Sequence, residues 1–420
     1  MEAKVSTLSN GLRIVSESME GLETVSLGIW VDVGARDENY NVNGVSHLLE
    51  HMAFKGTERR SAQAIAEEIE AVGGHLNAYT SREQTAYYAK VMRVDVGLAV
   101  DLLADILLNS IFDDQELARE RSVVLQEIAQ SQDTPDDQIF EYFQEVAYPN
   151  QPLGRSILGS AEKVAAYQRS ILINYMNENY SPDRMVISAA GSVDHNSLVS
   201  MIDEKFGHLN SNKPKEREKA IYLGGEKIVH RDLEQIHFAI GFDSFSFDDP
   251  DFYPLQAFST FLGGGMSSRL FQEIRERRGL AYSIFTFNSA YVDGGTFGIY
   301  VGSGQDQFSE LVPVLAEETL RSNCGITEDE ANRARAQLKS GLLMSLESSS
   351  SRCERLARHM LIFGRPIPIN EMVSELDSVS KTDIERVAQR IIGSSEPSIA
   401  VLGPISGFKG KDSISQNFRG

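Results

Sequence analysis

The stretch His47-Leu48-Leu49-Glu50-His51 decides how this 420-residue chain is interpreted. Successive residues of an α-helix are rotated by about 100°, so the two imidazoles, one turn apart, point to the same side and Glu50 lies beside them. Two neutral imidazoles in this arrangement can bind a divalent metal, and a carboxylate next to the metal can take a proton from water. The stretch therefore predicts a helix that carries part of a hydrolytic metal site.

Apolar residues surround this motif, and they argue against an ordinary surface helix with two histidines. The neighbouring apolar positions are Val45, Leu48, Leu49, Met52 and Phe54. Such flanks indicate that the polar side chains are at least partly buried, and buried imidazoles and carboxylates need a partner such as a metal. The order His-x-x-Glu-His is also a signature of zinc peptidases, in which the motif is reversed relative to the commoner one.

A catalytic zinc site usually has three protein ligands, so a third ligand is expected on another helix. The segment from Gln115 to Gln130 has the pattern of an amphipathic helix, and it carries Glu120 and Glu127. Two helical turns separate these glutamates, so they share one face. Glu127 is the better candidate for a ligand because Leu125 and Ile128 flank it, while Glu120 can orient a ligand or the water. The alternative is a solvated acidic helix.

Together, these residues resemble the active-site region of the pitrilysin-type metallopeptidases, and specifically the branch of the mitochondrial processing peptidase. The similarity covers Gly44–Thr57, Gly73–Thr80 and Leu153–Gly159, and it extends from about Leu8 to Gly403. The family pattern places the third zinc ligand at Glu127 and an accessory glutamate at Glu120. It implies one Zn²⁺ per chain, held by His47, His51 and Glu127, with Glu50 as the catalytic base. Ser46, where the family usually has alanine, is the one departure near the motif.

The resemblance also implies substrate-binding residues in the second half of the chain. Arg275 and Tyr282 match the pair that holds the substrate backbone and stabilises the oxyanion, a task for which a phenolic hydroxyl is a suitable donor. The alternative reading is a solvated helix arginine and a core tyrosine.

Two further substrate contacts are expected in the first half. The segment from Leu76 to Thr80, with Asn77 and Ala78, resembles the family strand that pairs with an extended peptide. In the processing-peptidase branch, an acidic pair that binds an arginine falls at Asp137 and Glu141, one helical turn apart, and a carboxylate pair suits a guanidinium. A solvated acidic helix is again the alternative.

The order of predicted elements occurs twice, which indicates an internal duplication. In each half, a strand is followed by two helices, two strands and two helices, and the sequence predicts an α+β fold of two homologous tandem domains, each a mostly antiparallel sheet covered by helices on one face. The first set is Thr24–Val33, the motif helix, Ala62–Val72, Leu76–Thr80, Thr85–Val91, Asp95–Asn109 and Gln115–Gln130. The second is Gln235–Phe242, Tyr253–Leu262, Ser268–Arg277, Ala281–Phe287, Gly295–Val301, Phe308–Arg321 and Glu328–Leu346.

The expected domain boundaries follow from this repeat. Residues 1–209 form the metal-binding domain, 210–224 a polar linker, and 225–420 the second domain. The second copy has Leu255-Gln256-Ala257-Phe258-Ser259-Thr260 where the first has its metal motif, so it offers no ligand there.

Composition narrows the possible partners. The chain is 41% hydrophobic and 24% charged, as expected of a globular protein, and its net charge of −20 argues against nucleic acid or an anionic membrane as the main partner. No apolar run is long enough to span a bilayer, and the amino terminus lacks a signal-peptide pattern. Cys324 and Cys353 have no ligand-like spacing, which favours a reducing compartment. A bacterial cytoplasm is expected, and a mature protein of the mitochondrial matrix is the alternative.

The sequence thus predicts a zinc-dependent endopeptidase for unfolded or presequence-like peptides, some of which contain arginine. A homodimer is the expected assembly, with a heterodimer that includes a degenerate homologue as the alternative. Two rival functions stay open: a catalytically silent assembly subunit of the same fold, and a general oligopeptide-degrading peptidase.

Overall fold

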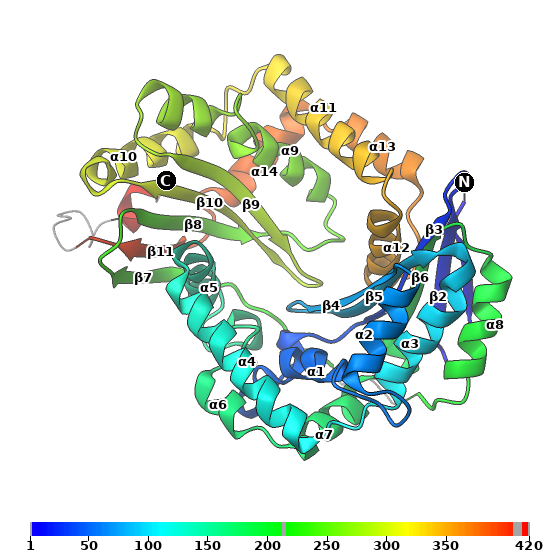
Figure 1. Cartoon of the computed structure of the whole chain (residues 1–420). Coiled ribbons are helices and arrows are strands. Elements are labelled where there is room, and N and C mark those ends of the chain that lie inside the picture. The colour runs from blue at the N-terminus through cyan, green and yellow to red at the C-terminus, as the bar shows by residue number, and fades with distance from the viewer. Residues whose placement is uncertain (1, 212–215, 406–413, 419–420) are drawn as a thin grey trace. The chain divides into compact units, whose positions relative to one another are not determined.

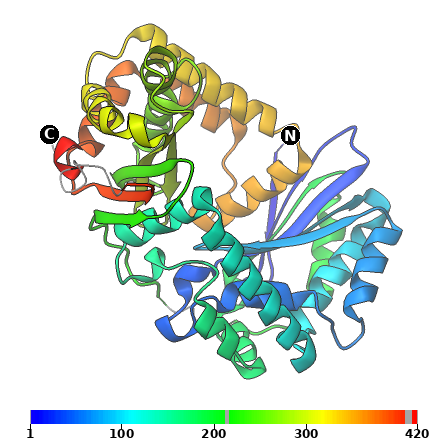
Figure 2. The same cartoon turned by 60° about the vertical axis from the view of Figure 1, so that its left-hand side comes forward.

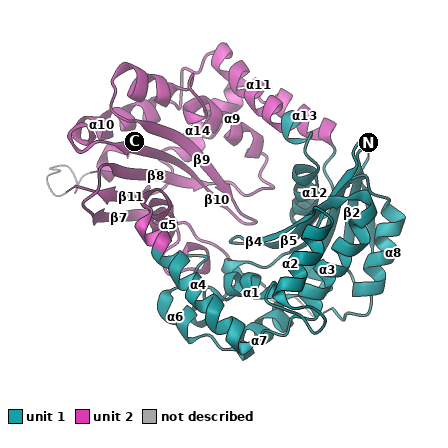
Figure 3. Cartoon of the chain, viewed as in Figure 1, with its two compact units in different colours: residues 1–129, 155–218, 343–368 teal, residues 130–154, 219–342, 369–420 magenta. Residues whose placement is uncertain are grey.

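A computed structural model of the chain describes residues 2–211, 216–405 and 414–418. The chain divides into two compact units, coloured separately in Figure 3. Unit 1 contains residues 1–129, 155–218 and 343–368, and unit 2 contains residues 130–154, 219–342 and 369–420. Each unit is therefore assembled from segments of both halves of the sequence.

Unit 1 is built on a sheet of six strands among the described residues, in the order β1-β2-β6-β3-β5-β4. All neighbours pair antiparallel except β2 and β6, which are parallel. The order leaves β4 at one edge of the sheet (Figure 1). The strands are β1 (Lys4–Thr7), β2 (Arg13–Ser18), β3 (Thr24–Val31), β4 (His75–Thr80), β5 (Thr85–Met92) and β6 (Met185–Gly191).

The main core of unit 1 lies on one face of this sheet. Alternate residues of β3, such as Val25, Leu27 and Ile29, point into it because side chains of a strand alternate between faces. Helices supply the other side of this core, among them α1 (Val45–Ala53), α2 (Ala62–Ala71), α3 (Val96–Leu108), α4 (Asp114–Asp133), α7 (Arg169–Asn179) and α8 (His195–Phe206).

The second face of the sheet is also covered, which corrects the expectation of helices on one face only. Trp30, on β3, packs there against helix α12 (Ser349–Phe363), orange in Figure 2. Cys353, Leu356 and Met360 of α12 are buried in this contact. Their spacing is that of an amphipathic helix, which the sequence analysis did not include.

Unit 2 repeats the plan with a sheet of five described strands in the order β7-β11-β8-β10-β9, again with one parallel pair, β7 and β11. Here α5 (Pro135–Ala147) covers the second face through Ile139 and Phe143. The predicted α+β fold of tandem domains with mostly antiparallel sheets is confirmed. The strands are β7 (Gly225–His230), β8 (Ile236–Ser244), β9 (Ser283–Ala290), β10 (Gly295–Ser303) and β11 (Ser398–Gly403).

Most of the remaining helices of unit 2 contribute to the core on the main face of its sheet, and α13 (Ile369–Ser378) packs against α9 (Phe252–Gly263). Where the sequence predicts an α-helix from Ser268 to Arg277, the structure has a π-helical segment, Phe271–Arg277. The other helices are α9 (Phe252–Gly263), α10 (Gln305–Arg321), α13 (Ile369–Ser378) and α14 (Lys381–Ile391), and α11 (Glu328–Ser345) begins in this unit.

The predicted linker, residues 210–224, includes residues 212–215, which lie outside the described part of the chain. Arg217, near its middle, is held by unit 1. Its guanidinium lies 2.9 Å from Asp32 and 3.0 Å from Asp37, and it also donates to the backbone oxygen of Glu83. The segment around Arg217 is therefore part of unit 1, and residues 219–224 belong to unit 2. The boundaries 1–209 and 225–420 stay a prediction about the extent of the two repeats.

Candidate metal centre

Helix α1 presents the two histidines of the motif on one side. Leu48, Leu49 and Met52 are buried in the core of unit 1, which fixes the rotation of the helix about its axis. His47 and His51 therefore share the opposite direction, with ring centroids 4.7 Å apart. The sequence places both imidazoles by simple helical spacing, and the core holds them there.

The first turn of α1 is held by a buried carboxylate, Glu38. The backbone N–H groups of Gly44 and Ser46 donate to it at 2.7 Å each, and the side-chain amide of Asn43 donates at 2.9 Å. These donors include backbone groups that a helix start leaves without a partner. Burial raises the pKa of Glu38 to about 7, although all three donors act in the opposite direction.

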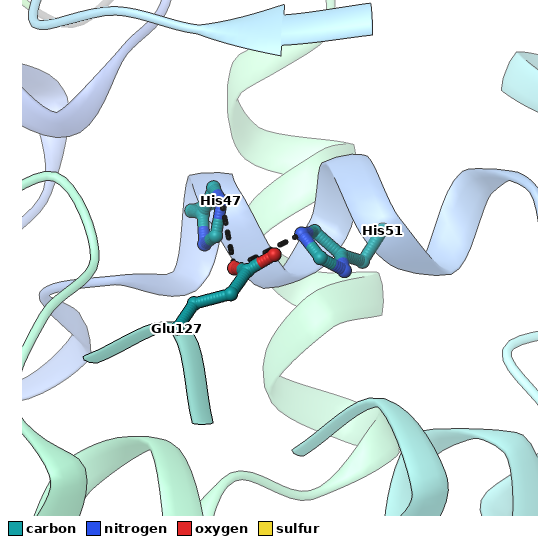
Figure 4. A group of neighbouring side chains, drawn as sticks. All are labelled: His47, His51 and Glu127. Atoms are coloured by element: carbon teal, nitrogen blue, oxygen red, sulfur yellow. Dashed lines mark ion pairs between the residues drawn. The ribbon is translucent and has the colours of Figure 1, made fainter. Parts of the chain in front are cut away.

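Glu127, on α4, completes the group of three (Figure 4). One of its carboxylate oxygens lies 3.6 Å from Nε2 of His47 and 3.5 Å from Nε2 of His51. Two ligand atoms that share a tetrahedral zinc ion at about 2.1 Å are roughly 3.4 Å apart, so these separations fit a shared ion. Within the described residues, no other group of three or more His, Cys, Asp or Glu side chains has this arrangement.

One buried atom of the group fits a metal site better than a hydrogen-bonded network. The carboxylate oxygen of Glu127 that faces Nε2 of both imidazoles has no hydrogen-bond partner among the described residues. Buried polar atoms are rarely left in this state. Burial, and then the neighbouring His51, lower the pKa of His47 to about 4, so this imidazole is neutral at pH 7 and its nitrogen can bind a cation.

Glu120 is on α4, the same helix as Glu127, and it contacts the ring nitrogen of His51 that faces away from Glu127. Nδ1 of His51 donates to one of its oxygens at 3.1 Å, and the ammonium group of Lys55 lies 2.8 Å from the other. A carboxylate on the far nitrogen of a ligand imidazole fixes the orientation and tautomer of the ring. Lys55 was not predicted as a site residue; it lies four residues after His51, just beyond the end of α1 at Ala53.

Glu50 is partly buried and points toward strand β4. The hydroxyl of Thr80 donates to its carboxylate at 2.6 Å. Burial raises the pKa of Glu50, and the hydrogen bond from Thr80 opposes this shift. A carboxylate with a raised pKa is a better proton acceptor during catalysis than an ordinary surface glutamate. Thr80 was part of the predicted strand, but no role was assigned to it.

Asn77 and Ala78 lie on β4, the edge strand. The side chain of Asn77 is exposed and that of Ala78 is buried, as expected when successive residues face opposite sides. Since β5 is the only described neighbour of β4, its other side keeps backbone groups available for an added strand.

The other predicted substrate residues lie in unit 2. The guanidinium of Arg275 stacks over the ring of Tyr282, at 5.1 Å from its centroid, so the structure brings this predicted pair together. Tyr282 is 72% exposed, which overturns the alternative of a core tyrosine. Asp137 and Glu141 lie one turn apart on α5. Their action on a substrate at the metal centre stays a prediction.

Comparison with known proteins identifies the family. A model described as "Insulinase (Peptidase family M16)" matches residues 13–161, and "Peptidase M16 inactive domain" matches residues 167–338. An "Uncharacterized zinc protease" of Rickettsia felis is 39% identical over 95% of this chain and 97% of the relative. The chain belongs to peptidase family M16. The second model's description agrees with α9, whose residues include no metal ligand.

Other M16 relatives and solved structures extend this result. A "Probable mitochondrial-processing peptidase subunit beta" of Arabidopsis thaliana is 39% identical over 96% of this chain and 79% of its own length. The fold matches a protease from Helicobacter pylori with a TM-score of 0.88 at 23% identity, covering 96% of this chain and 99% of the other. It also matches a chain of complex III₂ from Candida albicans with a TM-score of 0.88 at 20% identity, covering 99% and 100%. The predicted family resemblance is thereby confirmed.

Proposed function

We propose that this member of family M16 is a zinc-dependent endopeptidase that hydrolyses unfolded or presequence-like peptides, with one Zn²⁺ per chain. The observation that carries the proposal is the convergence of His47, His51 and Glu127 from two helices, with ligand atoms within 4.8 Å of one another. Relatives named as zinc proteases support the choice of zinc.

In the proposed mechanism, His47, His51 and Glu127 hold the metal, which when bound acidifies water and polarises a carbonyl group. Glu50 accepts the proton of the attacking water and later passes it to the leaving amine. Thr80 keeps the carboxylate of Glu50 in place during both transfers through its 2.6 Å hydrogen bond.

Side chains around the ligands have supporting tasks in this proposal. Glu120 orients His51, and Lys55 balances the charge of Glu120. Tyr282 donates its hydroxyl to the developing oxyanion, and Arg275 holds the substrate backbone. The edge of β4, with Asn77 and Ala78, pairs with the extended peptide.

A preference for arginine near the cut is proposed for the acidic pair on α5. Asp137 and Glu141 are one turn apart, and two carboxylates at this spacing can bind a guanidinium in its planar geometry. The named similarity to a mitochondrial-processing peptidase subunit supports this assignment.

Assembly and compartment follow from the same reasoning. A homodimer is proposed, with a heterodimer as the alternative. Several relatives come from bacteria, which supports a bacterial cytoplasm, and the Arabidopsis relative supports a mitochondrial matrix as the alternative. Within the described residues, no helix combines the length and apolar character that crossing a bilayer requires.

One experiment separates the endopeptidase from a silent assembly subunit. Purified protein is analysed for metal and incubated with a mixed peptide pool, with and without chelator, and the products are identified by mass spectrometry. We expect internal cleavage that chelator abolishes, and Glu50→Gln protein should keep its zinc but not cleave. Zinc-loaded protein that leaves every peptide intact would reject the proposal, and wild-type turnover by the Gln variant would remove Glu50 from the mechanism.

The same products distinguish a processing enzyme from an oligopeptide scavenger. Cleavage at a few sites in longer peptides supports processing. Cleavage of short peptides of any sequence supports the alternative function.

A further inference from the structure

Unit 1 contains a second feature beside the edge strand, a cavity on the face of the sheet opposite α1. Its volume is about 610 Å³, and it lies between strands β3, β4 and β5 and helix α12. Because β4 is also the strand proposed to pair with substrate, a peptide bound at its free edge would lie next to strands that line this cavity.

Strand register divides the cavity into two ends. At one end, Lys90 of β5 is paired in register with Ser26 of β3 on one side and with His75 of β4 on the other. At the other end, four residues along β4, Tyr79 lies next to Trp30, whose indole N–H donates to the phenol oxygen at 3.2 Å. At about 3.3 Å per residue, the two ends are roughly 13 Å apart.

The two ends differ in charge. Lys90 is exposed and has no ion-pair partner among the described residues, and serine hydroxyls of Ser26 and Ser350 lie close to it in the lining. Glu354 is at the aromatic end, where it accepts a hydrogen bond from Tyr79 at 3.3 Å. The first end can therefore attract an anion, although Glu354 lies only one helical turn from Ser350 on α12 and weakens this attraction.

We propose that the Lys90 end of this cavity binds the terminal carboxylate of a peptide that is being cleaved. The inference rests on the proposed function. Thr80, which contacts Glu50, marks the catalytic end of β4, and His75 is at the other end. A peptide that pairs antiparallel with β4 runs from Thr80 toward His75, so its carboxyl terminus approaches Lys90 when the cut lies roughly five residues from the end.

This assignment gives the enzyme a preference among substrates. Short peptides with a free carboxyl terminus at the right distance from the cut gain a contact that long chains cannot make at that distance. In this proposal, Lys90 binds the terminal carboxylate and so positions the peptide, but it does not touch the reacting atoms. Among the unfolded peptides of the proposed function, this contact favours those whose carboxyl terminus lies roughly five residues beyond the cut.

The test uses zinc-loaded full-length protein and pairs of peptides that end in either a carboxylate or a carboxamide. The segment after the cut is lengthened one residue at a time. We expect kcat/KM to be about fivefold higher for the carboxylate at one length, because an exposed ion pair contributes up to about 1 kcal/mol. Lys90→Gln should remove this difference without changing the rate for the carboxamide, and Lys90→Arg should keep it.

Lys4→Gln is the matched control, because Lys4 is an exposed lysine on β1, at the opposite edge of the same sheet. It should keep the full difference between the two peptide ends. An amidated peptide with glutamate as its last residue shows whether a side-chain carboxylate is sufficient. If that peptide matches the free acid, the assignment to the chain terminus is overturned.

A binding assay keeps this proposal separate from the peptidase proposal. Fluorescence anisotropy with Glu50→Gln protein measures the affinity for the same labelled peptides without cleavage. Tighter binding of the carboxylate form, lost in the double variant with Lys90→Gln, supports the anchor even if no peptide is cut. Equal affinity for both peptide ends, or an equal loss for both on replacing Lys90, overturns it, even if cleavage is rapid.

Discussion

Replacing Glu38 tests whether a buried carboxylate outside the metal centre holds the motif helix in place. In Glu38→Ala protein, the N–H groups of Gly44 and Ser46 and the amide of Asn43 lose their acceptor. At about 1 kcal/mol for each lost hydrogen bond, the free energy of unfolding should fall by roughly 3 kcal/mol. Glu38→Gln should cost less, roughly 1–2 kcal/mol, since its amide oxygen can still accept from one side of the site.

The pH dependence of this effect has a defined sign. The pKa of Glu38 is raised from 4.5 to about 7 in the folded protein, so the folded state holds its proton over this range while the unfolded state releases it. The stabilising contribution is complete below pH 4.5, decreases as the pH rises, and is lost above about 7. The total change corresponds to roughly 3 kcal/mol.

Urea unfolding of wild-type and Glu38→Gln protein, both stripped of metal, measures this difference at several pH values. Below pH 4.5 the wild type should be roughly 1–2 kcal/mol more stable than the Gln variant, and because the pH-dependent change is larger than this, the advantage should shrink as the pH rises and reverse above about 7. Parallel stability curves for the two proteins would refute the reasoning, because the ionisation of Glu38 would then cost nothing on folding. A stable Glu38→Ala protein would show that the three donors find other partners.

Three further predictions concern the metal centre and its surroundings. Glu120→Gln should weaken metal affinity by roughly 10- to 100-fold, because His51 loses a charged partner, and competition with a chromogenic chelator measures this; unchanged affinity would contradict the assigned contact. Glu127→Ala should lose metal and peptidase activity together, and zinc retained at wild-type level after dialysis would exclude Glu127 as a ligand. Asp137→Asn combined with Glu141→Gln should remove a preference for arginine-containing peptides in cleavage assays, and equal wild-type rates with and without arginine would reject this pair.

Local patterns were sufficient for most elements near the site. The predicted strand Thr24–Val33 is seen as Thr24–Val31, and the predicted helix Gln115–Gln130 as Asp114–Asp133. Both depend on periodicity within a short window, which the sequence shows directly. The spacing of His47 and His51 is local in the same way, whereas Glu127 lies far along the chain. Its apolar neighbours Leu125 and Ile128 favoured it over Glu120, and the family resemblance supported that choice.

Contacts between distant segments were not predictable by the same means. The amphipathic pattern of Cys353, Leu356 and Met360 could have identified helix α12, but no local signal states that it packs against Trp30. Likewise, Arg217 lies in a polar stretch typical of a linker, although its partners are in unit 1. Tertiary packing determines which surface α12 covers and which carboxylates pair with Arg217, because the local sequence of each is compatible with several partners.

The exchange of helices between the two halves affects how the protein can be synthesised. Residues 1–209 alone lack α12. During synthesis, after these residues have emerged from the ribosome, the apolar face around Trp30 and Val186 is exposed to water until residue 363 has also emerged. Contacts over such long separations slow folding and expose surfaces that promote aggregation. Cutting the gene at the predicted linker would make this exposure permanent, whereas fragments rejoined by coexpression could still supply the missing helix.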